Sequence, residues 1–246
     1  MSPRPGRPAG VRLWAALAVV AVLIAGAGIA IGNRHGPAPL PERAEAERPT
    51  LLLLTSLPLV FPEKFGLEGG GSPALTALQR RYRIESINIA DSASLKGRRV
   101  LLMAHPLAQP AEVLVALDAW VSSGGRLVLL ADPKLNWPSE RPLGDRLRPP
   151  PAFTDTGLLK HWGLTLYAPD SEGTVERTVG GRKVSLSSPG AVGGACDVRS
   201  DGLVARCTIG RGKATIIADA DFLRVTDPDS DNLQFLLAEL DRIERE

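Results

Sequence analysis

A helix-length segment set between two short, continuously apolar runs limits the possible folds of this chain strongly. The runs Arg99–Ala104 and Arg126–Ala131 have the length of strands and show no alternation, which is typical of strands buried on both faces of a parallel sheet. Between them, Pro110–Gly125 places apolar residues at helical spacing and ends in two glycines. A right-handed strand–helix–strand unit is the default connection for such a pattern.

Further runs extend this unit on both sides. Thr50–Ser56 and Lys213–Ala218 are continuous apolar runs of strand length, and Arg83–Ile89 alternates as a strand does. Short strands and turns fill most of residues 164–209, and Ser230–Ile243 has the spacing of an amphipathic helix. We therefore expect an α/β fold with a mostly parallel, Rossmann-like sheet, helices on both faces and a β-hairpin-rich insertion. The helix should bury Leu233, Leu236, Leu237, Leu240 and Ile243.

An uncharged, apolar run lies near the N-terminus, from Leu13 to Asn33. Its length matches a helix that crosses a bilayer. The alternative is a cleaved signal peptide whose cleavage site is Ala25-Gly26-Ala27, but the apolar run continues past that site to Ile31. We therefore expect one transmembrane helix before the α/β fold. The expected parts are a cytoplasmic tail at 1–12, the anchor at 13–33, a linker at 34–49 and one extracytoplasmic domain at 50–246.

The only two cysteines, Cys196 and Cys207, flank a signal for a hairpin turn. Asp201-Gly202 favours a two-residue turn, and directly opposed strand residues have Cα separations that a disulfide accepts. The alternative is two free thiols in a cytoplasmic core. A disulfide indicates an oxidising compartment, so we expect an inner-membrane protein whose domain lies on the periplasmic side. A hairpin centred on this turn pairs Ser200 with Leu203, Arg199 with Val204, Val198 with Ala205, Asp197 with Arg206, and Cys196 with Cys207.

Polar residues follow the predicted parallel strands, at the edge where ligand groups gather in open α/β sheets. His105 has the most reactive side chain among them, but the sequence identifies no nucleophile beside it. Its alternative role is to cap a strand end or to form a hydrogen bond to a loop, and the alternative for Asp132-Pro133 is to end a strand and start a turn. The candidate binding residues are Ser56, His105, Asp132, Asp219 and Asp221.

Several kinds of site have no signature in the sequence. There is no phosphate-binding P-loop and no serine-hydrolase elbow. Asp227–Asn232 resembles the start of a calcium loop, but the sixth position is not glycine and the twelfth is Ala238 rather than Glu. We expect neither a metal nor another cofactor. The net charge of +2, with basic residues spread along the chain, argues against a nucleic-acid partner.

Several segments together resemble a known family, the GldG-like auxiliary domain of uncharacterised ABC-type transport systems. They are Gly97–Pro106, the stretch Leu117-Asp-Ala-Trp-Val-Ser-Ser-Gly-Gly125, Asp132-Pro133 and Thr156–Leu164. Gly210–Leu223 is similar to the closing strand of class I glutamine-amidotransferase-like domains. The resemblance implies an amidotransferase-like or flavodoxin-like fold in a membrane-tethered module. It implies no amidotransferase activity, because neither cysteine occupies a strand-to-helix turn.

The leading hypothesis is a membrane-anchored, non-enzymatic accessory or binding component of an ABC-type transport system. Its expected partners are the membrane and the permease and ATPase subunits of that system. The first alternative is a hydrolase-like enzyme that uses strand-end residues near His105 and Asp132, which requires the two to lie within hydrogen-bond reach in a pocket. The second is a structural envelope protein that recognises polysaccharide, which requires a groove with exposed Trp137 or Trp162.

Overall fold

The computed structural model describes residues 37–61, 63 and 71–246. The chain divides into two compact units, Met1–Ala38 and Pro39–Glu246, and the second contains nearly all of the described residues. The predicted tail and transmembrane anchor lie outside the described residues. Within the described ranges, no helix combines the length and the apolar character needed to cross a membrane.

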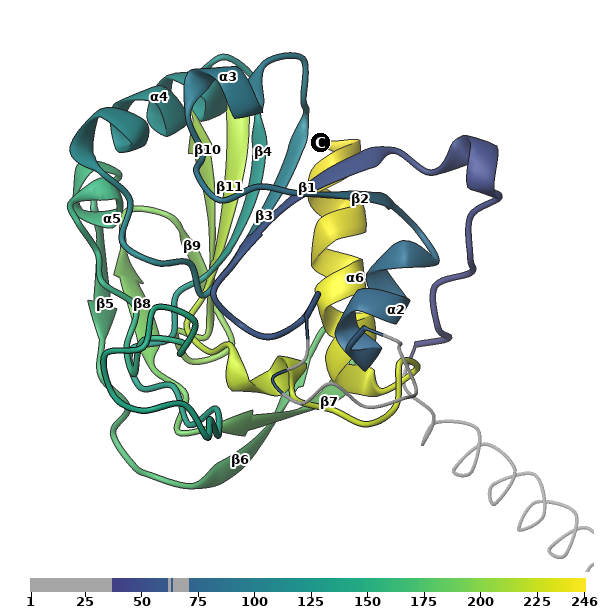
Figure 1. Ribbon diagram of the computed structural model, residues 1–246, viewed down its shortest axis with the longest axis vertical. Coiled ribbons are helices and arrows are strands. Elements are labelled where there is room, and N and C mark those ends of the chain that lie inside the picture. The colour runs from purple at the N-terminus through teal and green to yellow at the C-terminus, as the bar shows by residue number, and fades with distance from the viewer. Residues whose placement is uncertain (1–36, 62, 64–70) are drawn as a thin grey trace, which may run out of the picture. The chain divides into compact units, whose positions relative to one another are not determined.

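A seven-stranded mixed sheet forms the centre of the unit Pro39–Glu246. Its strands are β1 (Thr50–Thr55), β2 (Arg83–Ser86), β3 (Val100–Ala104), β4 (Arg126–Leu130), β9 (Asp197–Arg199), β10 (Val204–Ile209) and β11 (Gly212–Ile217). Their order is β2-β1-β3-β4-β11-β10-β9 (Figure 1). The first five strands are parallel, and β10 and β9 complete the sheet in antiparallel register. The connection after β1 leads to one side of the sheet and the connection after β3 to the other, which makes the β1–β3 boundary the switch point of the topology.

The central strands supply two separate hydrophobic cores because successive side chains point to opposite faces. Every side chain of β3 and β4 is buried, and within β1 Leu51 and Leu53 enter one core while Leu52 and Leu54 enter the other. The first core is covered by α2 (Pro73–Gln79) and α6 (Asp231–Arg245). The second core is covered by α3 (Ser92–Leu95), α4 (Ala111–Ser122) and α5 (Leu158–His161).

Two small antiparallel sheets lie beside these layers. The first consists of β6 (Thr174–Val179) and β7 (Arg182–Ser187), and its buried side chains join the core under α6. The second consists of β5 (Leu164–Tyr167) and β8 (Ala191–Gly194), which pack against the other core. A short 3-10 helix, η2 (Asp221–Leu223), connects β11 with the segment before α6.

Helix α6 is held in place by its apolar face and by buried charges. The five residues predicted to face inward are all buried, which confirms the helical spacing. Asp241, which is also buried on α6, forms ion pairs with Arg81 at 2.6 Å and with Arg43 at 3.1 Å. Arg43 lies just before η1 (Glu45–Glu47), in the segment predicted to be a linker, and its guanidinium also lies over the ring of Tyr82. The chain therefore contacts the domain before residue 50.

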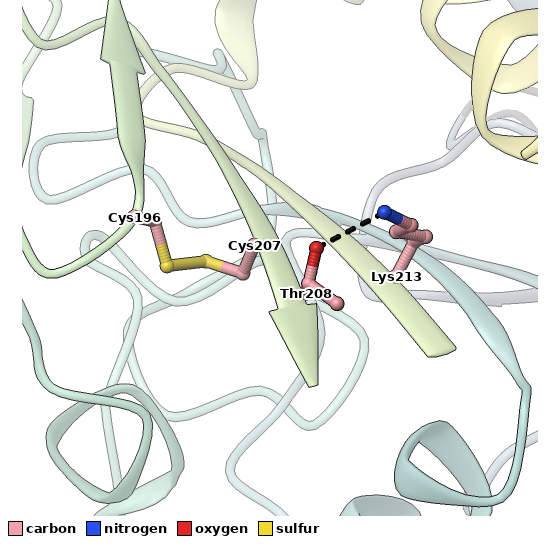
Figure 2. Close-up of a disulfide and its surroundings, with 4 residues drawn as sticks. All are labelled: Cys196, Cys207, Thr208 and Lys213. Atoms are coloured by element: carbon pink, nitrogen blue, oxygen red, sulfur yellow. Dashed lines mark hydrogen bonds between the residues drawn. A yellow bond between two sulfur atoms is a disulfide. The ribbon is translucent and has the colours of Figure 1, made fainter. Parts of the chain in front are cut away.

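The cysteine hairpin has the predicted register and the predicted disulfide. Strands β9 and β10 pair Arg199 with Val204 and Asp197 with Arg206, and Leu203 donates a backbone hydrogen bond to Ser200 across the turn. Cys196 and Cys207 are bonded, with their Cα atoms 4.9 Å apart (Figure 2). The hairpin was expected to belong to an insertion, but β10 pairs with β11 along six residues and extends the central sheet. The parallel sheet thus becomes a mixed one at this edge.

Loss of the disulfide should destabilise the domain. The two cysteines are separated by 11 positions, and a cross-link that closes such a loop contributes about 3 kcal/mol by restricting the unfolded chain. We expect the double variant Cys196→Ser/Cys207→Ser to lose about that much free energy of unfolding in urea titrations. The reduced wild-type protein is the matched control, and a double variant as stable as the oxidised protein would contradict the expectation.

Candidate functional site

The five candidate residues all lie at the carboxyl-terminal edge of the parallel strands. Ser56 follows β1, His105 follows β3 and Asp132 lies two residues after β4. Asp219 and Asp221 lie just beyond the end of β11. Because β1, β3, β4 and β11 are neighbours in that order, the topology brings these residues to one edge of the sheet.

His105 is the most unusual residue of this edge. Its φ is +48°, in the left-handed region that non-glycine residues rarely adopt, and its side chain is 0% exposed. Its backbone nitrogen donates to the carbonyl oxygen of Leu130, which continues the pairing of β3 with β4. Strained backbone of this kind clusters at functional sites, so the conformation is a reason to consider a role beyond ending a strand.

The ring of His105 is fixed through one nitrogen and unpartnered at the other. Nε2 lies 2.9 Å from the carbonyl oxygen of Pro150, while Nδ1 is buried and has no hydrogen-bond partner among the described residues. A carbonyl oxygen can only accept, so Nε2 carries the hydrogen and Nδ1 carries the lone pair. Burial lowers the pKa of the imidazole, which favours its neutral form.

The end of β1 supports the backbone of His105. The Ser56 hydroxyl donates to the carbonyl oxygen of His105 at 2.5 Å, and the Thr55 hydroxyl donates to that of Ala104 at 2.8 Å. These bonds connect the two strands on either side of the switch point at the last register pair and one residue beyond it. Ser56 therefore positions the His105 main chain and uses its hydroxyl hydrogen to do so.

Asp132 is engaged with backbone amides on both of its oxygens. The amide of Lys134 donates to Oδ1 and the amide of Ala220 to Oδ2, each at 2.8 Å. The pKa of this carboxyl is raised to about 6, mainly by burial and in smaller part by the nearby charge of Asp221. The hydrogen bonds of Asp132 and His105 go to different partners, so the His105–Asp132 contact on which the hydrolase alternative depended is not formed.

Asp219 and Asp221 extend the same network from β11. Asp219 accepts from the amides of Ser187 and Phe222, at 3.1 and 3.0 Å, and burial with the nearby Asp132 charge raises its pKa well above the ordinary value. Oδ2 of Asp221 accepts from the amide of Asn136 at 2.6 Å. Oδ1 of Asp221 is buried without a partner, and burial raises the pKa of this carboxyl as well.

The carboxylates do not form a metal centre. The described residues contain no group of three or more His, Cys, Asp or Glu side chains that could hold a metal ion. Each acid instead holds an irregular segment against the strand ends: the turn after β4, the end of β7 and the start of η2. Chemically, the edge combines a buried neutral imidazole with carboxyls that are more easily protonated than usual.

The predictions missed the partners that complete this edge. The Pro150 carbonyl oxygen accepts a hydrogen bond from Nε2 of His105. Asn232 joins β7 to η2 by donating to the carbonyl oxygens of Ser185 and Phe222. A backbone oxygen in an irregular segment has no sequence signal. Of the two tryptophans that the polysaccharide alternative required to be exposed, Trp162 is buried and donates to Asp118, and Trp137 is partly buried against the first core.

Comparisons with known proteins give matches only among solved structures. No protein-family model and no curated protein matches the sequence. The chain is similar to an exo-β-1,4-mannosidase from an Opitutaceae bacterium (strain TAV5), at 12% identity and a TM-score of 0.46, over 80% of this chain and 34% of that one. It is also similar to a β-galactosidase from Bacillus circulans sp. alkalophilus, at 14% identity and a TM-score of 0.48, over 84% and 32%. The chain thus spans about a third of the glycosidases it matches.

A further match is a cytoplasmic protein from Salmonella typhimurium LT2, at 12% identity and a TM-score of 0.49, covering 79% of this chain and 99% of that one. These findings correct the predicted GldG-like family membership and the amidotransferase-like assignment drawn from it, because no family model matches the chain. The structures matched are glycosidases and Salmonella proteins instead. At these identities the substrates of those proteins are not transferred to this chain.

The functional predictions that depended on the resemblance are corrected too. Nothing supports a membrane-anchored accessory component of an ABC-type transport system, and the matches include enzymes, against the expectation of a non-enzymatic protein. The predicted inner-membrane, periplasmic placement has no support in these findings: the predicted anchor lies outside the described residues, which contain no helix able to cross a membrane, and two of the matched proteins are named as cytoplasmic. The absence of nucleic-acid partners stays a prediction.

The buried carboxyls should make stability depend on pH. The folded pKa of Asp132, about 6, lies above the ordinary 3.8, so its contribution is complete below pH 4 and is lost as the pH rises through 6. Asp219 acts in the same direction. We expect the free energy of unfolding to fall between pH 4 and 7, with about 3 kcal/mol of the decrease due to Asp132.

Urea titrations at several pH values would measure this slope. Asp132→Asn removes the titrating group, so it should flatten the slope, although it also weakens one amide hydrogen bond at every pH. The exposed Asp170→Asn is the matched control and should keep the wild-type slope. A wild-type protein whose stability rises steadily from pH 4 to 7 would show that these carboxyls are ionised in the fold.

Proposed function

We propose that the protein is a hydrolase-like enzyme in which His105 is the general base. The observation that carries the proposal is the buried imidazole whose Nε2 is fixed by the Pro150 carbonyl oxygen while Nδ1 keeps a lone pair without a partner. A neutral imidazole with a free lone pair is the form that accepts a proton. The position of His105 at the switch point, where ligands bind in open α/β sheets, supports the same role.

In the proposed reaction a water molecule donates a hydrogen bond to Nδ1 and attacks the electrophilic atom of the substrate. Nδ1 takes the proton as the new bond to oxygen forms, and the imidazolium that results is stabilised by the Nε2 hydrogen bond to Pro150. The bond to the leaving group then breaks, and the leaving group departs with the proton from Nδ1. The balance is one water consumed for one bond cleaved.

Two features of the carboxyl edge determine how His105 is positioned and how a substrate can reach it. Ser56 holds the His105 main chain through its carbonyl oxygen, so Ser56 is a positioning residue in this proposal. The imidazole is fully covered, so a substrate reaches Nδ1 only after a local movement of the chain that covers this nitrogen, with the Nε2 hydrogen bond to Pro150 kept. The carboxyls of Asp132 and Asp219 hold the neighbouring turns and are not assigned a proton-transfer step.

The test compares wild type with His105→Gln on p-nitrophenyl acetate, p-nitrophenyl phosphate and a set of p-nitrophenyl glycosides. Gln keeps a donor for the Pro150 carbonyl oxygen and removes the base. We expect kcat/KM on the accepted substrate to fall by about 100-fold or more. The rate should also rise with pH through an apparent pKa below the ordinary 6.5 of histidine, because burial lowers the pKa of His105.

His161→Gln is the matched control, since His161 is an exposed histidine on α5 and should leave the rate unchanged. Thermal melting of each variant establishes that it is folded. If wild type hydrolyses none of the three substrate classes faster than His105→Gln, the enzymatic proposal is rejected. Equal losses in both histidine variants would reject His105 as the base.

A further inference from the structure

A hollow lies at the amino-terminal edge of the sheet, opposite the candidate site, between α3 and α4. These two helices contact each other on the same face of the sheet (Figure 1). The hollow has a volume of about 540 Å³. Its lining comes from α3, the turn between α3 and β3, one side of α4, and the turn between α4 and β4.

The polar part of the lining is entirely basic or neutral. Lys96, Arg98 and Arg99 contribute three cations from one turn, and no acidic residue lines the hollow. Arg98 is paired with Glu85 at 2.6 Å. Lys96 and Arg99 are exposed and form no ion pair with any residue in the described ranges. Two positive charges are therefore available to a ligand at this place.

The remainder of the lining is apolar and rigid. The Trp120 indole is fixed by a hydrogen bond from Nε1 to the carbonyl oxygen of Arg98, at 3.1 Å. Its ring lies so close to Gly125 that a Cβ at that position would stand 2.5 Å from the ring carbons. Leu95, Ala116 and Ala119 complete the apolar surface. A ring of a ligand could thus lie on a preformed apolar surface next to the cations.

A buried cation behind the hollow strengthens its positive potential. Arg126 at the start of β4 donates to the carbonyl oxygens of Gly124 and Arg211, at 2.8 and 3.3 Å. Burial and the positive charge of Arg99 lower the pKa of Arg126, so the two guanidinium groups repel each other. An anion bound beside Arg99 would relieve this repulsion.

We propose that this hollow binds an organic anion, in which a phosphate or carboxylate group is attached to a flat ring. The anionic group would be held by Lys96 and Arg99 through charge-assisted hydrogen bonds. The ring would lie against Trp120 and the two alanines of α4. The site does not depend on the hydrolase proposal, because the central strands separate it from the carboxyl edge by five residues, about 17 Å.

The experiment titrates the full chain by calorimetry with three matched probes. Phenyl phosphate has the charge and the ring, inorganic phosphate has only the charge, and phenol has only the ring. We expect phenyl phosphate to bind about tenfold or more tightly than either of the other two. Added NaCl should weaken its binding, because the two cations are exposed to solvent.

Three variants test which side chains are responsible. Lys96→Gln/Arg99→Gln should weaken phenyl phosphate binding about tenfold or more. The control, Arg146→Gln/Lys183→Gln, removes the same charge from exposed positions elsewhere and should bind as wild type does. Trp120→Leu should reduce the preference for phenyl phosphate over phosphate, with thermal melting as the check on its folding.

The outcomes are distinct. Equal binding of phosphate and phenyl phosphate would overturn the ring-recognition part and leave a general counterion site. Equal weakening in both charge variants would show that net charge alone is responsible and would overturn the site. No detectable binding of phenyl phosphate at millimolar concentration would overturn the proposal as a whole. None of these results changes the expected behaviour of His105→Gln.

Discussion

The burial of the central strands on both faces determines where everything else in this domain can be placed. Each residue of β3 and β4 is buried, and apart from Arg126 at the start of β4 their side chains are apolar, so polar side chains lie at or beyond the strand ends. A parallel strand buried on both sides gains from the hydrophobic effect along its whole length. The polar chemistry of the chain is therefore divided between two edges of the sheet. The carboxyl edge collects histidine and aspartates, and the amino edge collects arginines and a lysine.

The aspartates at the carboxyl edge hold neighbouring segments in place, although burying their charges is unfavourable. Removing a carboxylate from water is unfavourable, and three acids on neighbouring turns repel each other as well. Each of them receives at least one backbone amide, and Asp132 and Asp219 receive two. Those bonds attach irregular segments to the strand ends, in addition to the apolar contacts that these segments make with the hydrophobic cores. The His105 ring lies among these segments, where its one unpartnered nitrogen is screened from water.

The sequence predicts local elements of this structure well and long-range contacts poorly. The hairpin register and the disulfide follow from Asp201-Gly202, because a two-residue turn fixes which residues face each other. The buried face of α6 follows from helical spacing. The location of the candidate site could be predicted from the sequence, since parallel strands end at one edge of the sheet. The hydrogen bonds that its residues form could not be predicted. The partner of His105 is a proline carbonyl 45 positions away, and the family resemblance rested on turn and helix motifs that many α/β chains share.

The shortness of β9 has a consequence for how this protein behaves in solution. An outer strand presents unpaired amides and carbonyls, to which a strand from another molecule can add. Here that strand has three residues, all exposed, and two of them are the charged Asp197 and Arg199, which pair with each other at 2.8 Å. The disulfide at Cys196 prevents the segment from peeling away from β10 (Figure 2). The half of β10 that pairs with β9, Val204–Arg206, thus stays covered, and this part of the sheet is protected from edge-to-edge self-association.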